Sequence, residues 1–362
     1  MFHALSSVLG DVCIVFNVFR YITFRSIMSA VTSFMLCLCL GPYFIEHLKH
    51  FGLKHDSKKP FTEAIHAWSE TKAQIPTMGG LLIIASIVLS ILLWGNLQNR
   101  FILWLLAIVL WFGLVGFLDD WIKIQRRNSI GLRSGTKLTG QLILGTILGC
   151  FLFTRPGEAL GIYIPFFKSV FIPLGILYIP FVIFVLVGTS NAMNLTDGMD
   201  GLAIGCLIMA AGAFTVITYV TGHSVFSKYL HIPFVPEAGE LSVACAALVG
   251  AGAGFLWFNA YPATVFMGDT GALALGGCLG AIAIFIKQEL VLLIVGGVFV
   301  WEALSVILQV GSFKLRGKRI FKCSPYHIHL QMCGWPESKI TIRLWIIAFI
   351  LALIGLSTLK LR

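Results

Sequence analysis

Residues 101–120 read "FILWLLAIVLWFGLVGFLDD", an apolar run that ends in two adjacent aspartates. Residues 101–118 carry no charge, and about 20 such residues are enough to cross a bilayer as a helix. Asp119 and Asp120 then stand where the span meets the membrane surface. Two neighbouring carboxylates are costly there, so the run predicts a membrane helix that ends in a functional site.

The composition extends this interpretation to the whole chain. Of the 362 residues, 58% are hydrophobic and 12% are charged, and a soluble protein would carry about twice that charged fraction. The apolar segments do not alternate with period two, which argues against the strands of a membrane barrel. Nine cysteines lie mostly inside these segments and imply no disulfide framework. The sequence therefore predicts an all-α integral membrane protein.

Hydropathy predicts about ten transmembrane helices. They are residues 26–45, 77–94, 101–118, 138–154, 171–188, 201–221, 241–259, 272–286, 290–310 and 340–359. Residues 1–24 lack the basic start and the cleavage site of a signal peptide, so we expect a retained interfacial helix there. No repeat and no long linker divides the chain, which predicts one polytopic domain over residues 1–362.

The basic residues predict the orientation of these spans. Most of those in loops fall on one side of the membrane, in residues 46–76, 119–137, 189–200, 260–271 and 311–339. Basic residues in short loops favour the cytoplasm, so both termini are expected to be external. The net charge of +10 is thus concentrated where anionic lipid headgroups or a phosphorylated substrate would be met.

Every dense polar motif falls in these same five loops. The motifs are "KAQIPTMGG" (72–80), "FLDD" (117–120), "NAMNLTDGMDG" (191–201), "FMGDTG" (266–271) and "SPYHIHLQ" (324–331). Each acid alone could be a solvated helix cap. Their common side predicts one active site at the cytoplasmic face.

The aspartates in these motifs favour a hard divalent cation. They are Asp119, Asp120, Asp197, Asp200 and Asp269. Clustered carboxylates repel one another unless a cation is present, and Mg²⁺ binds one or two carboxylates together with water and phosphate oxygens. The "DGMDG" motif lacks the later glutamate of a calcium loop. Mg²⁺ with a phosphorylated substrate is therefore the better interpretation.

Local helix geometry suggests separate roles for the aspartates and the neighbouring motifs. Asp119 and Asp120 diverge by about 100° if the helix continues through them, so one could face a metal and the other a nucleophile. The motif "NLTDGMDG" immediately precedes a span, and a helix N-terminus there could face phosphate. No Walker or Rossmann pattern occurs, which excludes a soluble-type nucleotide site.

Two histidines occupy the last loop. His327 and His329, flanked by Cys323 and Cys333, raise a zinc alternative, but the spacing matches no common structural finger. Hydrogen bonds to a pyrophosphate fit the acidic cluster better. In an extended loop, His327 and His329 would share a face and Ile328 would point away.

Long motifs carry a family resemblance. "PTMGG", "GFLDD", "NAMNLTDGMDGLA", "GFLWFNAYPATVFMGDTGALALGG", "EALSVILQV", "GKRIFKCSPYHIH" and "GWPE" occur in this order along nearly the whole chain. The chain resembles the phospho-N-acetylmuramoyl-pentapeptide transferases, bacterial membrane enzymes that make the first lipid intermediate of peptidoglycan. They belong to the superfamily of polyprenyl-phosphate N-acetylhexosamine-1-phosphate transferases.

The resemblance implies the reaction and the partners. The substrates would be UDP-N-acetylmuramoyl-pentapeptide from the cytoplasm and undecaprenyl phosphate from the bilayer of the bacterial inner membrane. The products would be the undecaprenyl-pyrophosphoryl sugar-pentapeptide and UMP, with Mg²⁺ as the cofactor. A homodimer is expected and nucleic acid is not.

The resemblance also implies the roles of individual residues. Asp119, Asp120, Asp269 and His327 would be catalytic, with Asp269 and Asp119 as metal ligands. The substrate-binding positions would be Lys72, Thr77, Lys123, Asn191, Asn194, Asp197, Gly198, Met199, Asp200, Phe266 and His329, with Phe266 stacking on uracil. Which of Asp119 and Asp120 is the base stays open, as does the choice between direct displacement and an aspartyl-phosphate.

One departure from the family pattern keeps a second enzyme in view. The family has three consecutive histidines where this chain has Ile328 between two. That feature lends slight support to a sister transferase that moves N-acetylglucosamine 1-phosphate to a polyprenyl phosphate. A transporter is the alternative from another class, but its acids would be expected near the bilayer midplane.

Overall fold

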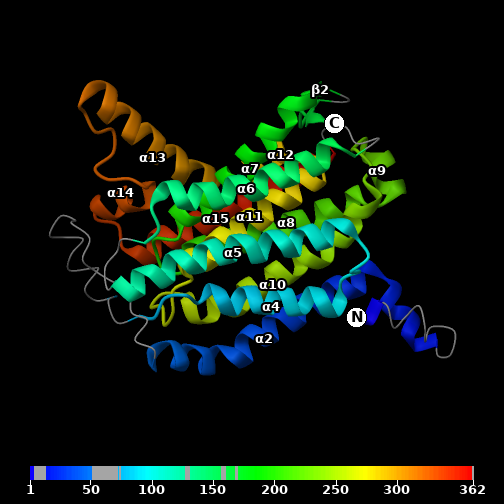
Figure 1. Ribbon diagram of the computed structural model, residues 1–362, viewed down its shortest axis with the longest axis horizontal. Coiled ribbons are helices and arrows are strands. Elements are labelled where there is room, and N and C mark those ends of the chain that lie inside the picture. The colour runs from blue at the N-terminus through cyan, green and yellow to red at the C-terminus, as the bar shows by residue number, and fades with distance from the viewer. Residues whose placement is uncertain are drawn as a thin grey trace.

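The computed structural model describes residues 1–3, 14–50, 72, 75–126, 131–155, 160–167 and 170–360. Its long helices run roughly parallel to one axis and form a bundle (Figure 1). The helices are α2 (Ile22–His50), α4 (Gly80–Trp94), α5 (Arg100–Arg126), α6 (Ser134–Phe153), α7 (Tyr178–Thr196), α8 (Leu202–Thr221), α9 (Ser224–Leu230), α10 (Leu241–Asn259), α11 (Gly268–Phe285), α12 (Glu289–Val295), α13 (Gly297–Arg316), α14 (Tyr326–Met332) and α15 (Glu337–Ser357).

Within the described residues, nine helices are long and apolar enough to cross a membrane. The tenth predicted span, residues 77–94, corresponds to α4, which is apolar but has 15 residues. It lies in the interior of the bundle, and Ile83, Ile87 and Ile91 are fully buried. The prediction of a helical, multi-pass membrane protein is thereby confirmed.

Two predicted spans are interrupted. Residues 171–177 begin with strand β2 (Phe171–Pro173), which pairs antiparallel with β1 (Gly161–Tyr163), and continue as the 3-10 helix η2 (Gly175–Leu177). The span at 290–310 breaks at Gly296, between α12 and α13. Proline and glycine disfavour a continuous helix at these points, and a hydropathy average does not register them.

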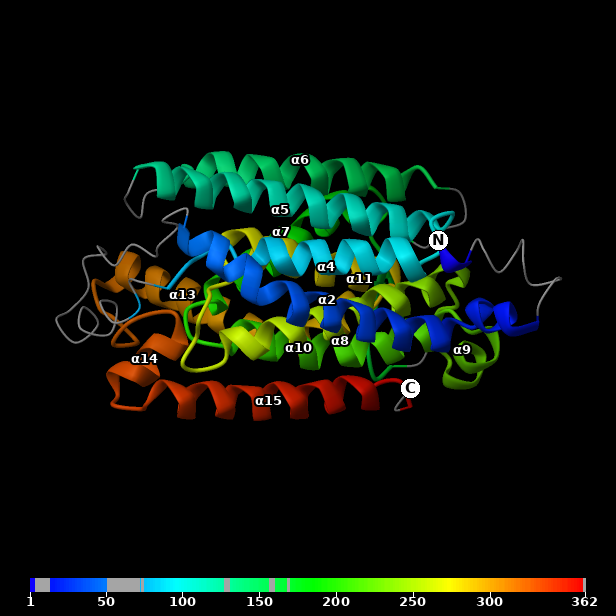
Figure 2. The same ribbon diagram turned by 90° about the horizontal axis from the view of Figure 1, so that it is seen from below.

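Helix α11 lies at the centre of the bundle. Figure 2 shows it between α5 and α6 on one side and α8, α10 and α15 on the other. Glycines let its first turn approach its neighbours closely: a Cβ at Gly80 would overlap the backbone of Gly271, and one at Gly116 would overlap the carbonyl of Asp269. These contacts bring α4 and α5 against the N-terminus of α11.

Both ends of the chain lie at the same end of the bundle. Figure 1 places the labels N and C, together with α9 and β2, at the right, and α14 at the left. Two further 3-10 helices, η1 (Ile14–Arg20) and η3 (Pro236–Glu240), complete the described elements. Residues 4–13 of the predicted N-terminal helix, and most of the predicted loop 46–76, lie outside the described residues.

Candidate active site

Three aspartates from two helices meet at one end of the bundle. Asp119 and Asp120 belong to α5, which continues past the predicted boundary to Arg126, and Asp269 lies in the first turn of α11. One oxygen from each carboxylate lies within 4.8 Å of the others. Among the described residues, this is the one group of histidine, cysteine, aspartate or glutamate side chains that could hold a metal.

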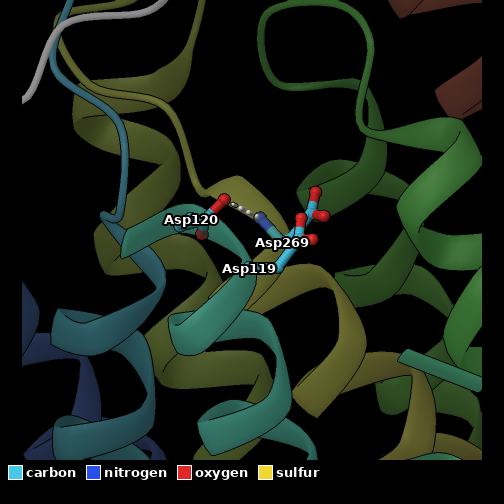
Figure 3. A group of neighbouring side chains, drawn as sticks. All are labelled: Asp119, Asp120 and Asp269. Atoms are coloured by element: carbon cyan, nitrogen blue, oxygen red, sulfur yellow. Dashed lines mark hydrogen bonds between the residues drawn. The ribbon is translucent and has the colours of Figure 1, made fainter. Parts of the chain in front are cut away.

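Asp120 holds the N-terminus of α11. Its carboxylate accepts hydrogen bonds from the backbone N–H groups of Asp269 at 3.3 Å and Thr270 at 2.9 Å, and from the Thr270 hydroxyl at 2.7 Å. Figure 3 shows the Asp119 and Asp269 side chains lying together, while Asp120 points to the backbone nitrogen of Asp269. A carboxylate at a helix N-terminus is favoured by the free N–H groups and the helix dipole.

Two lysines balance the charge of the aspartates. Lys123 Nζ lies 2.6 Å from Asp119 Oδ2 and 3.0 Å from Asp269 Oδ2. Lys137, from α6, donates to Asp269 Oδ2 at 2.6 Å. Lys123 was predicted by resemblance to bind substrate, and Lys137 was not predicted as a site residue.

Asn194 completes this network. In the amide orientation that satisfies both neighbours, it donates to Asp269 Oδ1 at 3.0 Å and accepts from Lys137 at 2.9 Å. It therefore contacts Asp269 and Lys137, whereas the resemblance predicts a substrate-binding position. Carboxylate oxygens in this arrangement fit Mg²⁺, which prefers hard oxygen ligands and needs only one or two of them from the protein.

A cavity of about 480 Å³ opens beside the aspartates. Its lining includes Asp119, both lysines, Gln141 and Asn191. Asn191 donates through Nδ2 to Gln141 Oε1 at 2.9 Å and to the carbonyl of Val187 at 2.8 Å. Since both amide hydrogens are used in this way, Asn191 offers its carbonyl oxygen, an acceptor, to a ligand. Gln141 was not predicted as a site residue. The available signal was its spacing of four residues from Lys137, which places both side chains on one helix face.

A second polar cluster lies around Lys72. Its ammonium donates to Asp200 Oδ1 and, at 2.6 Å, to Glu337 Oε1. Asp200 Oδ2 accepts from the backbone N–H of Ala263 at 3.0 Å, and the Phe266 ring centroid lies 5.7 Å from Lys72 Nζ. The structure thus brings together the predicted residues Lys72, Asp200 and Phe266. Glu337 was missed as a site residue, although it ends the quoted motif "GWPE".

The loop between α7 and α8 contributes the remaining residues of "TDGMDG". Burial, with the nearby charges of Asp269 and Asp120, raises the pKa of Asp197 to about 8. Gly198 is exposed, whereas the Met199 side chain is buried. Thr77 lies against Gly268, at the start of α11.

The N-terminus of α8 does not match its expected role in phosphate binding. Its N-cap residue, Gly201, donates its N–H to Asn259 at 3.1 Å and accepts at its carbonyl from Trp345 at 3.1 Å. Leu202 and Ala203 are buried. Protein side chains cover this helix end, so the expectation that it faces phosphate was wrong.

His327 is the buried member of the histidine pair. Its Nδ1 lies 3.1 Å from Glu302 Oε2, and Glu302 is fully buried on α13. His327 Nε2 has no hydrogen-bond partner among the described residues and lies 2.3 Å from the position that a Cβ on Gly198 would take. Glu302 was missed because a single glutamate inside an apolar run gives no signal of its partner.

His329 points elsewhere. Residues 326–332 form α14, so positions two apart are separated by about 200° and the expectation of a shared face was wrong. His329 Nδ1 accepts from the backbone N–H of Lys322 at 3.2 Å, and its ring packs near Phe321 and Tyr326. Between Pro325 and Gly334 no proline or glycine interrupts helix α14.

Comparison with known proteins defines the class. A family model described as glycosyl transferase family 4 matches residues 101–287, a segment that contains the three aspartates and both lysines. Together with the membrane bundle, this match defines a polytopic membrane glycosyl transferase.

Full-length relatives define the family more closely. Proteins named phospho-N-acetylmuramoyl-pentapeptide-transferase from Pelobacter propionicus, Citrifermentans bemidjiense and Geobacter sp. strain M21 are 49%, 50% and 50% identical to the chain. Each match covers the whole of both proteins. The chain therefore belongs to the phospho-N-acetylmuramoyl-pentapeptide transferases, enzymes of glycosyl transferase family 4. It is an enzyme of peptidoglycan synthesis, and its family implies a nucleotide-sugar substrate and a lipid carrier in a membrane.

Proposed function

We propose that this enzyme transfers phospho-N-acetylmuramoyl-pentapeptide from its UDP-linked form to undecaprenyl phosphate, in a reaction that depends on Mg²⁺. The products are the undecaprenyl-pyrophosphoryl sugar-pentapeptide and UMP. The observation that carries this proposal is the cavity of about 480 Å³ lined by Asp119, Lys123 and Lys137. Carboxylates for a divalent cation and ammonium groups for phosphates meet there in one space.

The bond changes are those of a phosphoryl-group transfer. An oxygen of undecaprenyl phosphate forms a bond to the sugar-linked phosphorus of the donor, and the bond from that phosphorus to UMP breaks. The second pKa of a phosphate monoester is about 6, so the attacking oxygen is already largely ionised and needs little help from a base. Asp119 lines the cavity where this oxygen would arrive, whereas Asp120 is occupied at the N-terminus of α11.

Asp119 and Asp269 would hold Mg²⁺, with Asp120 keeping the α11 backbone in place. When bound, Mg²⁺ supplies a Lewis acid for the charge that develops on the leaving UMP. Lys137 donates to Asp269 Oδ2 and Asn194 donates to Asp269 Oδ1. The protein thus orients Asp269 with groups that do not themselves react.

His327 contributes a hydrogen bond to a phosphate oxygen. Its Nδ1 is engaged by Glu302, which leaves Nε2 as the ring nitrogen for a ligand. The buried Glu302 side chain, 3.1 Å from Nδ1, holds the ring in place. Donors of this kind, placed in a site shielded from water, stabilise charge that develops during the reaction.

The cluster around Lys72 binds the nucleoside. Uracil presents two carbonyl oxygens on either side of an N–H group, and Lys72 and Asp200 provide a donor and an acceptor within one buried pair. Phe266 lies beside this pair and provides a ring for stacking. Glu337 fixes Lys72 and also accepts from the backbone N–H of Asp200 at 2.8 Å.

We further propose that the enzyme is a homodimer in the bacterial inner membrane, with its site at the cytoplasmic face. The family resemblance and the basic residues in the predicted cytoplasmic loops support this placement. Exposed apolar side chains on α7 and α13, such as Phe184 and Ile307, suit contact with lipid tails and the approach of a polyprenyl chain.

A donor-choice assay tests the reaction. Purified protein in lipid receives undecaprenyl phosphate with an equal mixture of UDP-N-acetylmuramoyl-pentapeptide and UDP-N-acetylglucosamine, and the lipid products are separated. We expect the pentapeptide-bearing lipid and an equal amount of UMP. A predominant N-acetylglucosamine lipid would instead support the sister transferase.

A further inference from the structure

The Lys123 ammonium lies between the two carboxylates assigned to the metal. It is 2.6 Å from Asp119 Oδ2 and 3.0 Å from Asp269 Oδ2. Asp119 is one helical turn before Lys123 on α5, whereas Asp269 belongs to α11. The ammonium therefore connects the two helices through the oxygens that a cation would use.

A metal ion and this ammonium exclude one another. Mg²⁺ binds oxygen at about 2.0–2.1 Å, so an ion held by Asp119 and Asp269 would approach their carboxylates more closely than an ammonium does. Lys123 Nζ already bonds an oxygen of each of these carboxylates. Besides the overlap, two cations at this separation repel strongly in a site that is largely buried.

We propose that Lys123 is an exchangeable counter-ion, which holds Asp119 and Asp269 together in the metal-free enzyme and is displaced by Mg²⁺ into the substrate cavity. This inference rests on the proposed function, because it takes these two aspartates as the metal ligands. The displaced ammonium then binds the phosphates of the nucleotide-sugar. Lys123 is thus a positioning residue in one state and a substrate ligand in the other.

Lys123 is better placed to move than Lys137. Both side chains line the cavity, but the Lys123 side chain is 31% exposed and the Lys137 side chain is 15% exposed. Lys137 also donates to Asn194 as well as to Asp269. Its Nζ is 3.9 Å from Asp119, too far for a hydrogen bond. Lys137 therefore bonds one of the two aspartates, whereas Lys123 bonds both and is the ammonium that a shared cation replaces.

The exchange couples metal binding to substrate binding. In the substrate-free enzyme, Mg²⁺ must displace an ammonium that loses its partners. When phosphates are present, the ammonium gains new partners in the cavity, so Mg²⁺ binds more tightly. Removal of Lys123 should strengthen Mg²⁺ binding to the substrate-free enzyme and reduce the added effect of a nucleotide.

Calorimetric titration with Mg²⁺ alone, and again with UDP present, tests this. Relative to the wild type, Lys123→Met should bind Mg²⁺ roughly tenfold more tightly without UDP. A tenfold change in Kd corresponds to about 1.4 kcal/mol of binding free energy, which the wild type uses to displace Lys123. UDP should then strengthen Mg²⁺ binding less in Lys123→Met than in the wild type. Arg126→Met removes the same charge from an exposed position on the same helix and should leave Mg²⁺ binding unchanged.

Three outcomes would overturn the proposal. They are Mg²⁺ affinity in Lys123→Met that is equal to or weaker than that of the wild type, an equal gain in Arg126→Met, and an undiminished effect of UDP. If Lys123→Met does not fold, Lys123→Gln replaces it, because the amide still donates to Asp119 without a charge, and the same gain is required. None of these titrations needs turnover, so a missing lipid product would refute the proposed function and leave this result standing.

Discussion

Asp119 and Asp120 are neighbours in sequence with different tasks. Asp120 accepts three hydrogen bonds from the first turn of α11, and Asp119 faces the cavity and the lysines. The sequence predicted their divergence, because consecutive helical residues point about 100° apart. It could not predict which one faces the cavity, since that depends on the position of a helix 150 residues later in the chain.

The His327–Glu302 pair gives a prediction at this scale. His327→Ala should lower kcat by roughly 10², as loss of a donor to developing charge does. Glu302→Gln should lower kcat as well, and the double variant should be no slower than His327→Ala, because Glu302 acts through the imidazole. Ile328→His is the matched control and should stay within a few-fold of the wild type. Kinetics on size-exclusion-purified protein check this, and additive losses in the double variant would contradict it.

Asp197 gives a prediction about pH. Its folded pKa of about 8 exceeds the ordinary value of 3.8, so between these values the folded protein binds a proton that the unfolded chain does not. In metal-free protein the free energy of unfolding should therefore fall as the pH rises from about 4 to about 8, and this component should level off above pH 8. Asp197→Asn should remove this pH-dependent part of the free energy of unfolding. Unfolding curves in detergent across this range give the comparison, and identical pH dependence in both proteins would contradict the assignment.

At the scale of elements, close packing of α4, α5 and α11 sets the site geometry. Most helices were predicted from hydropathy, because apolar runs of this length have few other solutions in a membrane. The polar motifs were also predicted to lie on one side. Their side-chain partners were not, since Lys137, Glu302 and Glu337 meet the motifs only through helix packing.

The contact between α4 and α11 can be tested with glycine variants. Gly80→Ala should destabilise the protein by about 1–3 kcal/mol, because the added methyl overlaps the Gly271 backbone. Gly311→Ala, on α13, meets nothing within 4 Å and should be neutral or stabilising by up to roughly 1 kcal/mol. Thermal unfolding of both variants in detergent provides the measurement. Equal stability of the two would show that the helices can separate without cost.

At the scale of the whole molecule, the site and the chain termini lie at opposite ends of the bundle. The C-terminal end of α5, which carries Asp119, lies towards α14, away from the labels N and C (Figure 1). A bilayer around the apolar helices would then separate the site from the termini. This arrangement agrees with the orientation that the basic residues predict.

Single-cysteine labelling on intact cells tests that orientation. Arg126 is the exposed last residue of α5, Lys318 is exposed between α13 and α14, and Lys228 is exposed on α9. Figure 1 shows α9 and α14 at opposite ends of the bundle. In a background without native cysteines, a membrane-impermeant thiol reagent should label position 228 and leave positions 126 and 318 unlabelled until the cells are opened. Labelling of position 126 from outside would reverse the assignment of the cytoplasmic face.

The central claim is that one cation site, built from α5 and α11, drives the transfer. It is tested most directly by measuring turnover and Mg²⁺-dependent thermal stabilisation on the same preparation of Asp269→Asn. Asp269 is expected to be a metal ligand, so the variant should lose activity and stabilisation by Mg²⁺ together, while it still elutes as a folded protein. Near-normal turnover of Asp269→Asn at low Mg²⁺ would contradict the account.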